Sequence, residues 1–334
     1  MSKSKKSKKS KKTEKSKQSQ PPAATGGVRI GVLVHAGKTF GGGLEELRAA
    51  LADLGHADPP WYEVERSKLA PKKIRKLIED DGVDRILVWG GDGTVRRCID
   101  AVMQRGAGDR VSIGVLPAGT ANLLASNLGI PTDLREAAEV AVCGQPRRID
   151  LGVVNDDEHF AVMAGVGFDA MMIRDADATG AKDRFGRIAY VWSAAHNTNV
   201  SPAQATITVD GQHWYTGEAS CVIAGNVGHL LGGIPAFPDA SPTDGLLEIG
   251  VVTARSRLDW VRLAGAAVAR RVEASRFGEV TRGTSLVVEL DRTLPWEADG
   301  GDRDRIDRFE VRCLPNAIAV CQPPVSRQIR EDHP

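Results

Sequence analysis

Two observations predict an α/β domain built on a parallel sheet, followed by a second, β-rich domain. Between residues 28 and 149, short apolar runs rich in strand formers alternate with segments whose apolar residues recur at helical spacing. This alternation is typical of a parallel sheet covered by helices. From Asp150 onward, short strand-like segments follow one another, several of them separated by turn residues. The length of 334 residues exceeds a single typical core, which also favours two domains.

The chain divides into four expected parts. Residues 1–27 are rich in Lys and Ser and contain too few apolar residues to form a core, so we expect a disordered basic tail. Residues 28–149 are expected to form the α/β domain and residues 150–322 the β-rich domain. Residues 323–334 are expected to be a C-terminal tail.

The α/β part predicts a regular order of elements. In chain order these are a strand at 28–34, a helix with Leu44, Leu47, Leu51 and Leu54 on its apolar face, a helix beginning at Pro71 with Ile74, Leu77 and Ile78 inward, a strand at 85–89, a helix with Val95, Cys98, Ile99, Val102 and Met103 on one face, a strand at 111–116, a short helix ending at Leu128, and a helix capped by Asp133. In such sheets, ligands bind at the carboxyl ends of the strands. The loops after the strands are therefore the first place to look for a site.

The second part predicts strands at 159–164, 204–209, 219–223, 245–252, 285–290, 308–313 and 317–321, interrupted by helical stretches near 186–196 and 256–275. The dipeptides Asp210-Gly211 and Asp244-Gly245 are turn signals between some of these strands. A GxGxxA pattern at residues 165–170 lacks a clear βαβ setting, so we do not interpret it as a dinucleotide site.

The most informative motif is a glycine-rich turn made of Gly90, Gly91, Asp92, Gly93 and Thr94, placed between a predicted strand and a predicted helix. Such a loop presents backbone N–H groups at a positive helix end, and glycines let a phosphate approach closely. An acid in this loop would repel a bare phosphate. A carboxylate at this position is useful beside a divalent cation, or beside a hydroxyl that must lose a proton. The motif therefore indicates phosphoryl transfer from a nucleotide; the alternative is an ordinary glycine turn with a capping Asp.

Two other strand ends carry glycine loops. The loop at residues 35–43 contains Lys38 and Thr39 as candidate phosphate contacts, but it is not a Walker motif because Val32 stands where that motif requires glycine. The loop at residues 119–122 contributes Gly119, Thr120 and Asn122. We expect all three loops to lie at one edge of the sheet.

Several classes of protein are disfavoured by composition. The five cysteines lack CxxC pairing and the seven histidines lack metal-binding spacing, which fits a reducing cytosol and argues against a disulfide framework or a zinc site. Residues 1–20 carry nine lysines and one glutamate, whereas the whole chain has a formal net charge of +1. The rest of the chain is thus mildly acidic, so specific nucleic-acid binding is not expected. No run approaches 18 apolar residues, so we expect a cytoplasmic protein whose contact with a membrane is peripheral.

Acidic turns in the second part are further candidates. They are Asp150, the pair Asp239 and Asp244, and the segment that runs from Asp299 to Asp302. Each could be a solvated turn residue, which is the more common case. Together with Asp92 they could instead place carboxylates around a cation and a substrate hydroxyl.

The ordered set of motifs resembles the catalytic-domain family of diacylglycerol kinases and sphingosine kinases, and it is most similar to the soluble bacterial lipid kinase branch. The matching segments are GGDGT at 90–94, GTAN at 119–122, RIDLG at 148–152, AGVGFDA at 164–170, PDASPTDGLL at 238–247 and WEADG at 296–300. The resemblance covers roughly residues 28–322. It implies an NAD kinase-like or diacylglycerol kinase-like α/β domain that binds the nucleotide, and a β-sandwich domain whose last strand returns to the first domain.

The resemblance also implies a reaction. ATP with Mg²⁺ would bind against the glycine loops, and a lipid hydroxyl, above all that of diacylglycerol, would receive the γ-phosphoryl group, which places the protein in phospholipid biosynthesis. Asp92 or Asp299 would accept the hydroxyl proton. Asp244 and the Leu246 carbonyl resemble a structural Mg²⁺ site, and Asp150 resembles an acid that links this site to the cleft.

This chain departs from the family pattern at three positions. His35-Ala36 stands where the family usually has Asn-Pro, Leu123 stands where an Asp often follows the Asn of the GTxN motif, and Gly301 replaces the Glu of a common Asp-Gly-Glu motif. Asp302 could substitute for that Glu. The departures leave Asp299 a less secure candidate than Asp92.

Two other functions remain open from the sequence. An NAD kinase-like enzyme also carries a GGDGT loop, and a catalytically silent protein that senses nucleotides or tethers to membranes would use the basic tail as its working part. In the kinase hypothesis the tail would contact anionic lipid near the lipid substrate. The sequence leaves the identity of the lipid and the oligomeric state open, a homodimer included.

Overall fold

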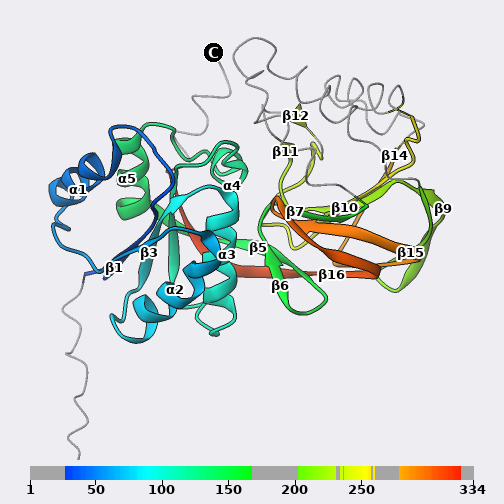
Figure 1. Ribbon diagram of the computed structural model, residues 1–334, viewed down its shortest axis with the longest axis horizontal. Coiled ribbons are helices and arrows are strands. Elements are labelled where there is room, and N and C mark those ends of the chain that lie inside the picture. Colours follow the sequence, from blue (N-terminus) through cyan, green and yellow to red (C-terminus); the bar gives the residue numbers. More distant parts are fainter. Residues whose placement is uncertain are drawn as a thin grey trace, which may run out of the picture.

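The computed structural model describes residues 27–167, 202–230, 234–235, 237–256, 259 and 278–324 (Figure 1). The expected tails, except residues 27, 323 and 324, lie outside these residues. So do Phe168, Asp169 and Ala170 of the AGVGFDA segment and the helical stretches expected near 186–196 and 256–275, apart from residues 256 and 259.

The first domain contains the predicted parallel sheet. Its strands are β1 (Ile30–His35), β2 (Trp61–Val64), β3 (Arg85–Gly90) and β4 (Ser112–Pro117), and they lie in the order β2-β1-β3-β4 with parallel pairing throughout. Every residue of β3 and β4 is buried, as expected for strands covered on both faces. The strand β2 was not predicted from the sequence, because it is short and only partly buried.

Helices cover this sheet in two pairs. The helices are α1 (Gly43–Asp53), α2 (Ala70–Glu79) with the short 3₁₀ helix η1 (Ser67–Leu69) before it, α3 (Asp92–Met103), α4 (Leu123–Asn127) and α5 (Leu134–Cys143). α1 packs against α5, and α2 packs against α3, so the pairs lie on opposite faces of the sheet (Figure 1). The side chain of Asp133 accepts a hydrogen bond from the Glu136 backbone N–H, which confirms the predicted cap of α5.

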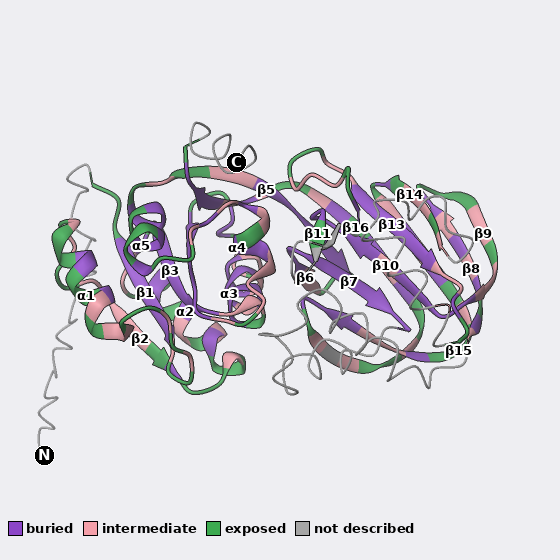
Figure 2. Cartoon of the chain, turned by 90° about the horizontal axis from the view of Figure 1, so that it is seen from above, coloured by how far each residue is buried: buried purple, intermediate pink, exposed green. Residues whose placement is uncertain are grey.

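The second domain is built from antiparallel strands. These are β6 (Glu158–Phe160), β7 (Met163–Val166), β8 (Ala203–Val209), β9 (Gln212–Ala219), β10 (Cys221–Gly225), the short pair β11 (His229–Leu230) and β12 (Ile234–Pro235), β13 (Leu247–Val252), β14 (Gly278–Gly283) and β15 (Ser285–Ala298). Ile207 of β8 and Ile249 of β13 belong to one buried cluster, although these strands do not pair. Strands of this domain that do not pair with each other therefore share one core, as in a sandwich, and Figure 2 shows the buried residues along them.

Two long strands connect the domains. β16 (Gly301–Gln322) pairs with β15 along its first half, and its last part pairs in parallel with β4 at Ala319 and Val320. β5 (Gln145–Val154) runs antiparallel to β16 across the same junction, so residue 150 lies inside a strand. The last described strand thus returns to the sheet of the first domain (Figure 1). Among the described helices, none combines the length and apolar character needed to cross a bilayer.

Candidate active site

Two of the glycine loops touch through their backbones. Gly91 follows β3 and Gly119 follows β4, and a Cβ atom added at Gly119 would lie 2.4 Å from the Gly91 Cα. A Cβ added at Gly91 would lie 3.0 Å from the Gly119 Cα. No side chain fits between the loops, so both positions require glycine for close approach and not for an unusual backbone angle. The predicted loops after β3 and β4 therefore form one continuous surface at the carboxyl edge of the sheet.

The first turn of α3 provides an open, positive surface. The helix begins at Asp92, after the extended N-cap residue Gly91, so the predicted loop is shorter than expected and its last three residues are helical. A Cβ added at Gly93 would meet no heavy atom within 4 Å. This open position at the N-terminus of a 12-residue helix can accommodate a phosphate group. The Thr94 hydroxyl, in contrast, is buried and lies 2.9 Å from the Ser67 hydroxyl, so Thr94 can offer only its backbone to a ligand.

Asp92 lies between the starts of two helices. Its Oδ1 accepts a hydrogen bond of 3.2 Å from the Leu124 backbone N–H at the start of α4. Burial raises the pKa of Asp92, while hydrogen bonds from backbone amides, including those of Leu123 and Leu124, act in the opposite direction. Asp92 as a whole residue is half-buried, at the carboxyl edge of the sheet. It is suited to hold a divalent cation or to take a proton.

The third loop is shaped by Asn122. Its Oδ1 accepts from the Gly119 N–H at 2.9 Å, and its Nδ2 donates to the carbonyls of Pro117 and Gly119 at 3.0 and 2.9 Å. Asn122 also adopts a left-handed backbone conformation, with φ of 48°, which Asn tolerates better than most residues. Its side chain therefore fixes the loop, whereas Thr120 is exposed and free to approach a ligand.

The first glycine loop is anchored on β3. The indole of Trp89 donates a 3.1 Å hydrogen bond to the Lys38 carbonyl, and the Phe40 ring packs edge-on against it. Lys38 is half-buried and Thr39 is exposed. Burial and the nearby Lys38 charge lower the pKa of His35, so this residue is neutral near pH 7. The structure thus places Lys38 and Thr39 at the same sheet edge as the other loops, at the end of β1.

Asp299 binds the backbone of residues 161–163 through its carboxylate. Its Oδ2 accepts from the Ala161 N–H, and its Oδ1 accepts from the N–H groups of Val162 and Met163, all at 2.9 Å. Burial raises the pKa of Asp299 to about 6, although these hydrogen bonds and the charge of Arg96 oppose the shift. Residues 161–163 pack in the core cluster of the first domain. Asp299 therefore joins the two domains, and it is more buried than Asp92.

An ion-pair network that was not predicted from the sequence lies one helical turn beyond Asp92. The buried Arg96 of α3 pairs with Glu158 of β6, which also pairs with Arg303 of β16. Burial raises the pKa of Glu158, but the hydrogen bonds and charges of the two arginines outweigh this and the net shift is downward. The network ties α3 to the second domain. The sequence signal was a charged residue at position 96, beside the apolar-face residue Val95.

The acidic turn of the second domain is held by Asp150. Its Oδ2 accepts from the Gly245 N–H and its Oδ1 from the Asn316 N–H, both at 2.7 Å, and Asp150 is fully buried. Asp244 is exposed, with Oδ1 accepting from the Leu246 N–H at 3.0 Å. Within the described residues, no three His, Cys, Asp or Glu side chains gather in a metal-binding group. The Asp244 carboxylate and the Leu246 carbonyl are nevertheless hard oxygen donors of the kind Mg²⁺ takes when water completes its shell.

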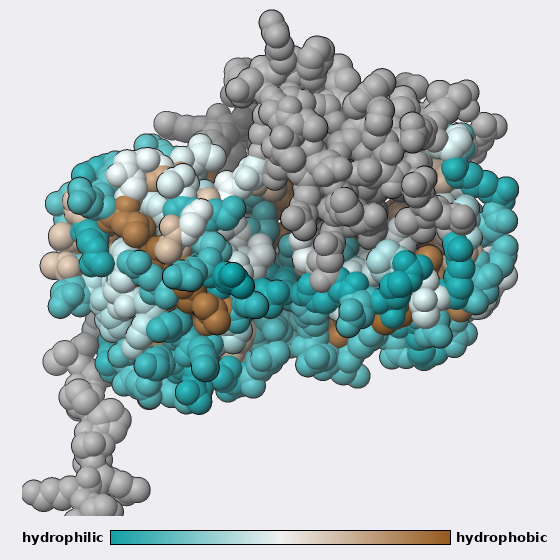
Figure 3. Space-filling view, viewed as in Figure 1, coloured by the Kyte–Doolittle hydropathy of each residue, from teal (hydrophilic) through white to brown (hydrophobic). Residues whose placement is uncertain are grey.

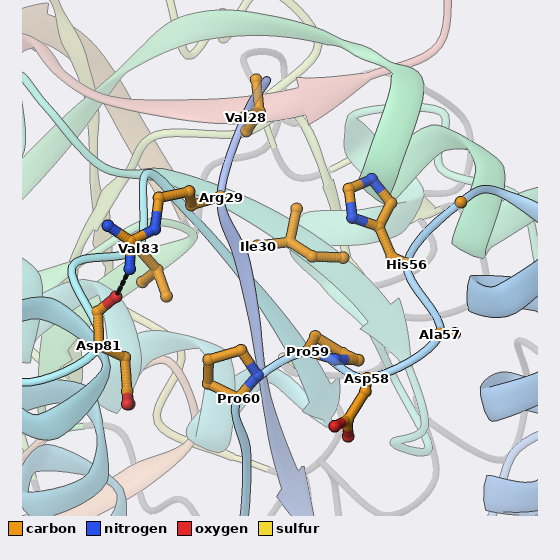
Figure 4. Close-up of a pocket in the computed structure, with 11 residues that line it drawn as sticks. Val28, Arg29, Ile30, His56, Ala57, Asp58, Pro59, Pro60, Asp81 and Val83 are labelled. Atoms are coloured by element: carbon orange, nitrogen blue, oxygen red, sulfur yellow. Dashed lines mark hydrogen bonds between the residues drawn. The ribbon is translucent and has the colours of Figure 1, made fainter. Parts of the chain in front are cut away.

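A cavity of about 350 Å³ lies at the opposite edge of the sheet (Figure 4). Val28, Ile30 and Val83 line it from the amino ends of β1 and β3, and Pro59 and Pro60 close one side. Arg29 donates to the Asp81 carbonyl at its rim. None of the predicted site residues lines this cavity, so the glycine loops form a separate site.

Together, the fold and the glycine loops define a two-domain protein in which a parallel α/β domain with glycine loops at its carboxyl edge is joined to a β-sandwich domain. Residues 32–154 match the model of the diacylglycerol kinase catalytic domain, and residues 162–322 match that of the YegS C-terminal NAD kinase beta sandwich-like domain. The chain belongs to this family, the YegS and diacylglycerol kinase family, which confirms the resemblance seen in the sequence.

Named relatives extend along almost the whole chain. A protein of Salmonella dublin named "Probable lipid kinase YegS" is 32% identical over 287 residues, which is 84% of this chain and 91% of the relative. One of Pectobacterium atrosepticum named "Probable lipid kinase YegS-like" is 28% identical over 306 residues, 88% of this chain and 96% of the relative. A crystal structure described as a diacylglycerol kinase from Bacillus anthracis has a TM-score of 0.69 at 21% identity and covers 90% of this chain and 99% of its own. That structure supports the fold.

Proposed function

We propose that this protein is an ATP-dependent lipid kinase that transfers the γ-phosphoryl group of ATP to a lipid hydroxyl, with diacylglycerol as the acceptor and phosphatidic acid as the product. One observation carries the proposal: the Gly91 and Gly119 loops touch beside Asp92, and they leave an open position at Gly93 on a helix N-terminus. The names of the relatives in the same family support a lipid acceptor.

The chain's own groups would bind and orient the nucleotide. The backbone N–H groups at the start of α3 would hold phosphate oxygens, and Gly93 would let them approach. Lys38, Thr39 and Thr120 would contact the phosphates from the neighbouring loops. Bound Mg²⁺ would neutralise charge on the phosphates, with the carboxylate of Asp92 as its protein ligand or neighbour. Asp244 and the Leu246 carbonyl would hold a second, structural Mg²⁺.

Proton transfer is best assigned to Asp92. The acceptor hydroxyl forms a bond to the γ-phosphorus, the bond from that phosphorus to the bridging oxygen of ADP breaks, and the hydroxyl proton passes to a carboxylate. Asp92 is half-buried beside the glycine loops, whereas Asp299 is buried and both of its oxygens accept from backbone N–H groups. Asp299 then acts as a positioning residue that fixes residues 161–163.

The site of action would be a membrane surface in the cytoplasm, because a diacylglycerol acceptor resides in a bilayer. The nine lysines among residues 1–20 are suited to anionic lipid headgroups. The tail and the catalytic domain would then act together: the tail would lengthen the time that the protein spends at the membrane surface, and the domain would transfer the phosphoryl group.

The deciding experiment is transfer of labelled γ-phosphate from ATP to a total lipid extract in mixed micelles, with Asp92→Asn and a parallel reaction on NAD. Label in the organic phase for the wild type alone supports the proposal, and chromatography identifies the lipid. Label on NAD would replace it with an NAD kinase activity. Absence of label in a protein that still binds ATP would favour a silent nucleotide-sensing or tethering role.

A further inference from the structure

A strongly cationic surface covers η1 and the start of α2. Between residues 66 and 76 the chain has six cationic side chains and no acidic one; they are Arg66, Lys68, Lys72, Lys73, Arg75 and Lys76. Five are exposed, and Lys73 is half-buried over the ring of Tyr62, with its Nζ 5.2 Å from the ring centroid. Within the described part of the chain, none of the six is paired with a carboxylate. We call these six residues and Leu69 the basic face.

The basic face contains an exposed apolar side chain. Leu69 is 44% exposed, and Val28 is the other large hydrophobic residue exposed in the described structure. Over the region of α2, Figure 3 shows a small apolar patch inside a largely hydrophilic surface. An apolar residue within a ring of lysines and arginines is typical of a surface that enters the interface of a bilayer.

The position of the basic face relates it to the candidate active site. The hydroxyl of Ser67, in η1, lies 2.9 Å from that of Thr94 in the glycine loop. Because α2 begins at this point, Leu69 lies at the carboxyl edge of the sheet, where the glycine loops lie. A surface pressed against Leu69 would therefore lie beside the glycine loops.

Helix stability does not explain this charge pattern. The first turn of α2 contains Lys72 and Lys73 and no acidic residue. Cations near a helix N-terminus interact unfavourably with the helix dipole, where acids are stabilising. Acidic side chains in the first turn of α2 would have kept the surface soluble and stabilised the helix. The cations found there therefore indicate an anionic partner.

We propose that the basic face is the surface on which this enzyme rests on an anionic lipid bilayer. Leu69 enters the headgroup region, and the five exposed cations face the lipid phosphates. The inference rests on the proposed function, since it brings a membrane-resident acceptor to the edge that carries Asp92. The partner is a bilayer because an exposed apolar residue adds nothing to binding of a free phosphate.

The test measures vesicle binding by the full chain without ATP. Sedimentation with phosphatidylcholine vesicles, with and without phosphatidylglycerol, compares the wild type with Lys72→Glu/Arg75→Glu and with Leu69→Ser. The charge-reversal variant is expected to lose at least about tenfold in partition to the anionic vesicles, since each cation near such a surface contributes appreciably. Raised salt screens the charges, so the vesicle binding that the wild type keeps at raised salt depends on its apolar contact. Leu69→Ser is expected to lose this remaining binding.

A matched control is Arg110→Glu/Arg305→Glu, which makes the same change in charge at exposed positions away from the basic face. Its vesicle binding should stay near that of the wild type. Phosphorylation of a short-chain lipid in detergent micelles should be unchanged in every variant, because no bilayer is needed there.

The outcomes separate this inference from the proposed function. Equal vesicle binding by the wild type and both variants would overturn the inference even if the protein is a lipid kinase. Loss of binding by the control as well would show a nonspecific charge effect and also overturn it. A raised KM for ATP in micelles with unchanged vesicle binding would reassign the face to the nucleotide. Absence of any lipid phosphorylation would refute the function while leaving the binding result interpretable.

Discussion

At the scale of single residues, the two candidate bases, Asp92 and Asp299, lie in different surroundings. Asp92 is half-exposed and accepts from the start of α4, whereas Asp299 is enclosed and accepts from three consecutive N–H groups. A carboxylate with three backbone donors is a fixed part of the fold. Asp92, the less buried of the two residues, is the one that we propose for the chemistry.

Asp92→Asn should remove most turnover while leaving the fold intact. The amide oxygen of Asn can still accept from the Leu124 N–H, but it cannot take a proton or hold a cation as strongly. Loss of a general base usually costs about 10²–10⁴-fold in rate. Measurement of kcat together with the thermal midpoint distinguishes the two effects. A rate near that of the wild type would contradict the assigned role.

Asp299 should make folding stability depend on pH in an unusual direction. Its pKa is about 6 in the folded state, above the ordinary value of 3.8, so the folded protein holds the proton to higher pH than the unfolded chain does. The contribution of this group to stability is therefore greatest below pH 3.8, decreases as pH rises toward about 6, and is constant above that.

Urea denaturation at several pH values in this window measures the slope for the wild type and for Asp299→Asn. The variant should lose the descending component, and it should be less stable overall by about 1–3 kcal/mol because Asn cannot accept from all three N–H groups. An identical slope in both proteins would show that Asp299 does not titrate there.

At the scale of elements, two glycines of the loops have different predicted roles: Gly119 is needed for packing, and Gly93 is proposed to leave room for a ligand. Gly119→Ala would place a methyl group 2.4 Å from the Gly91 Cα, and the backbone would have to move. We expect a loss of about 1–3 kcal/mol in the free energy of unfolding, together with lower activity. Chemical denaturation and ATP binding, measured in parallel, test this.

Gly93→Ala is the matched variant, because its methyl group would meet no atom within 4 Å. Alanine is the better helix former, so stability should rise by up to about 1 kcal/mol. ATP affinity should nevertheless fall, since the methyl group occupies the place proposed for a phosphate. Unchanged affinity would mean that no ligand approaches Gly93.

The contact between α3 and β6 also depends on one carboxylate. Glu158→Gln would leave Arg96 and Arg303 near each other without the acid that both of them bind. Complete removal of one partner from a buried pair costs about 3–5 kcal/mol, and the partial exposure of Glu158 should reduce this to roughly 2 kcal/mol. Asp156→Asn is the control, because its pair with Arg312 is exposed and should contribute less than about 1 kcal/mol.

The sequence predicted elements better than the contacts between them. The apolar faces of α2 and α3, the strands β3 and β4, and the Asp133 cap depend on local patterns, and the structure confirms them. The edge strand β14 was missed because its residues are largely polar and only partly buried. The hydrogen bonds between Asp299 and residues 161–163 join positions more than 130 residues apart, and no local sequence pattern indicates them.

At the scale of the whole molecule, positive charge is concentrated in residues 1–20, while the rest of the chain is mildly acidic. Deleting residues 1–20 would remove nine lysines. We expect weaker binding to anionic vesicles and unchanged activity in micelles, because under the proposed function the tail would hold the protein at the membrane and would take no part in the chemistry.

Raising salt above physiological levels should reproduce the effect of the deletion, since screening acts over about 8–10 Å. Loss of activity in micelles after the deletion would instead favour a tethering or sensing role in which the tail is the working part. Salt-independent binding of the wild type would count against an electrostatic tail.

The path of β16 has a consequence for how the protein is made on the ribosome. Residues 318–322 add a strand beside β4, yet they are synthesised after nearly all of the second domain. Until they emerge, β4 has an unpaired edge and the junction with β5 is incomplete. The first domain cannot complete its sheet cotranslationally in the usual order from the N-terminus. A nascent chain stalled before residue 300 should therefore be more protease-sensitive within residues 30–117 than the released protein.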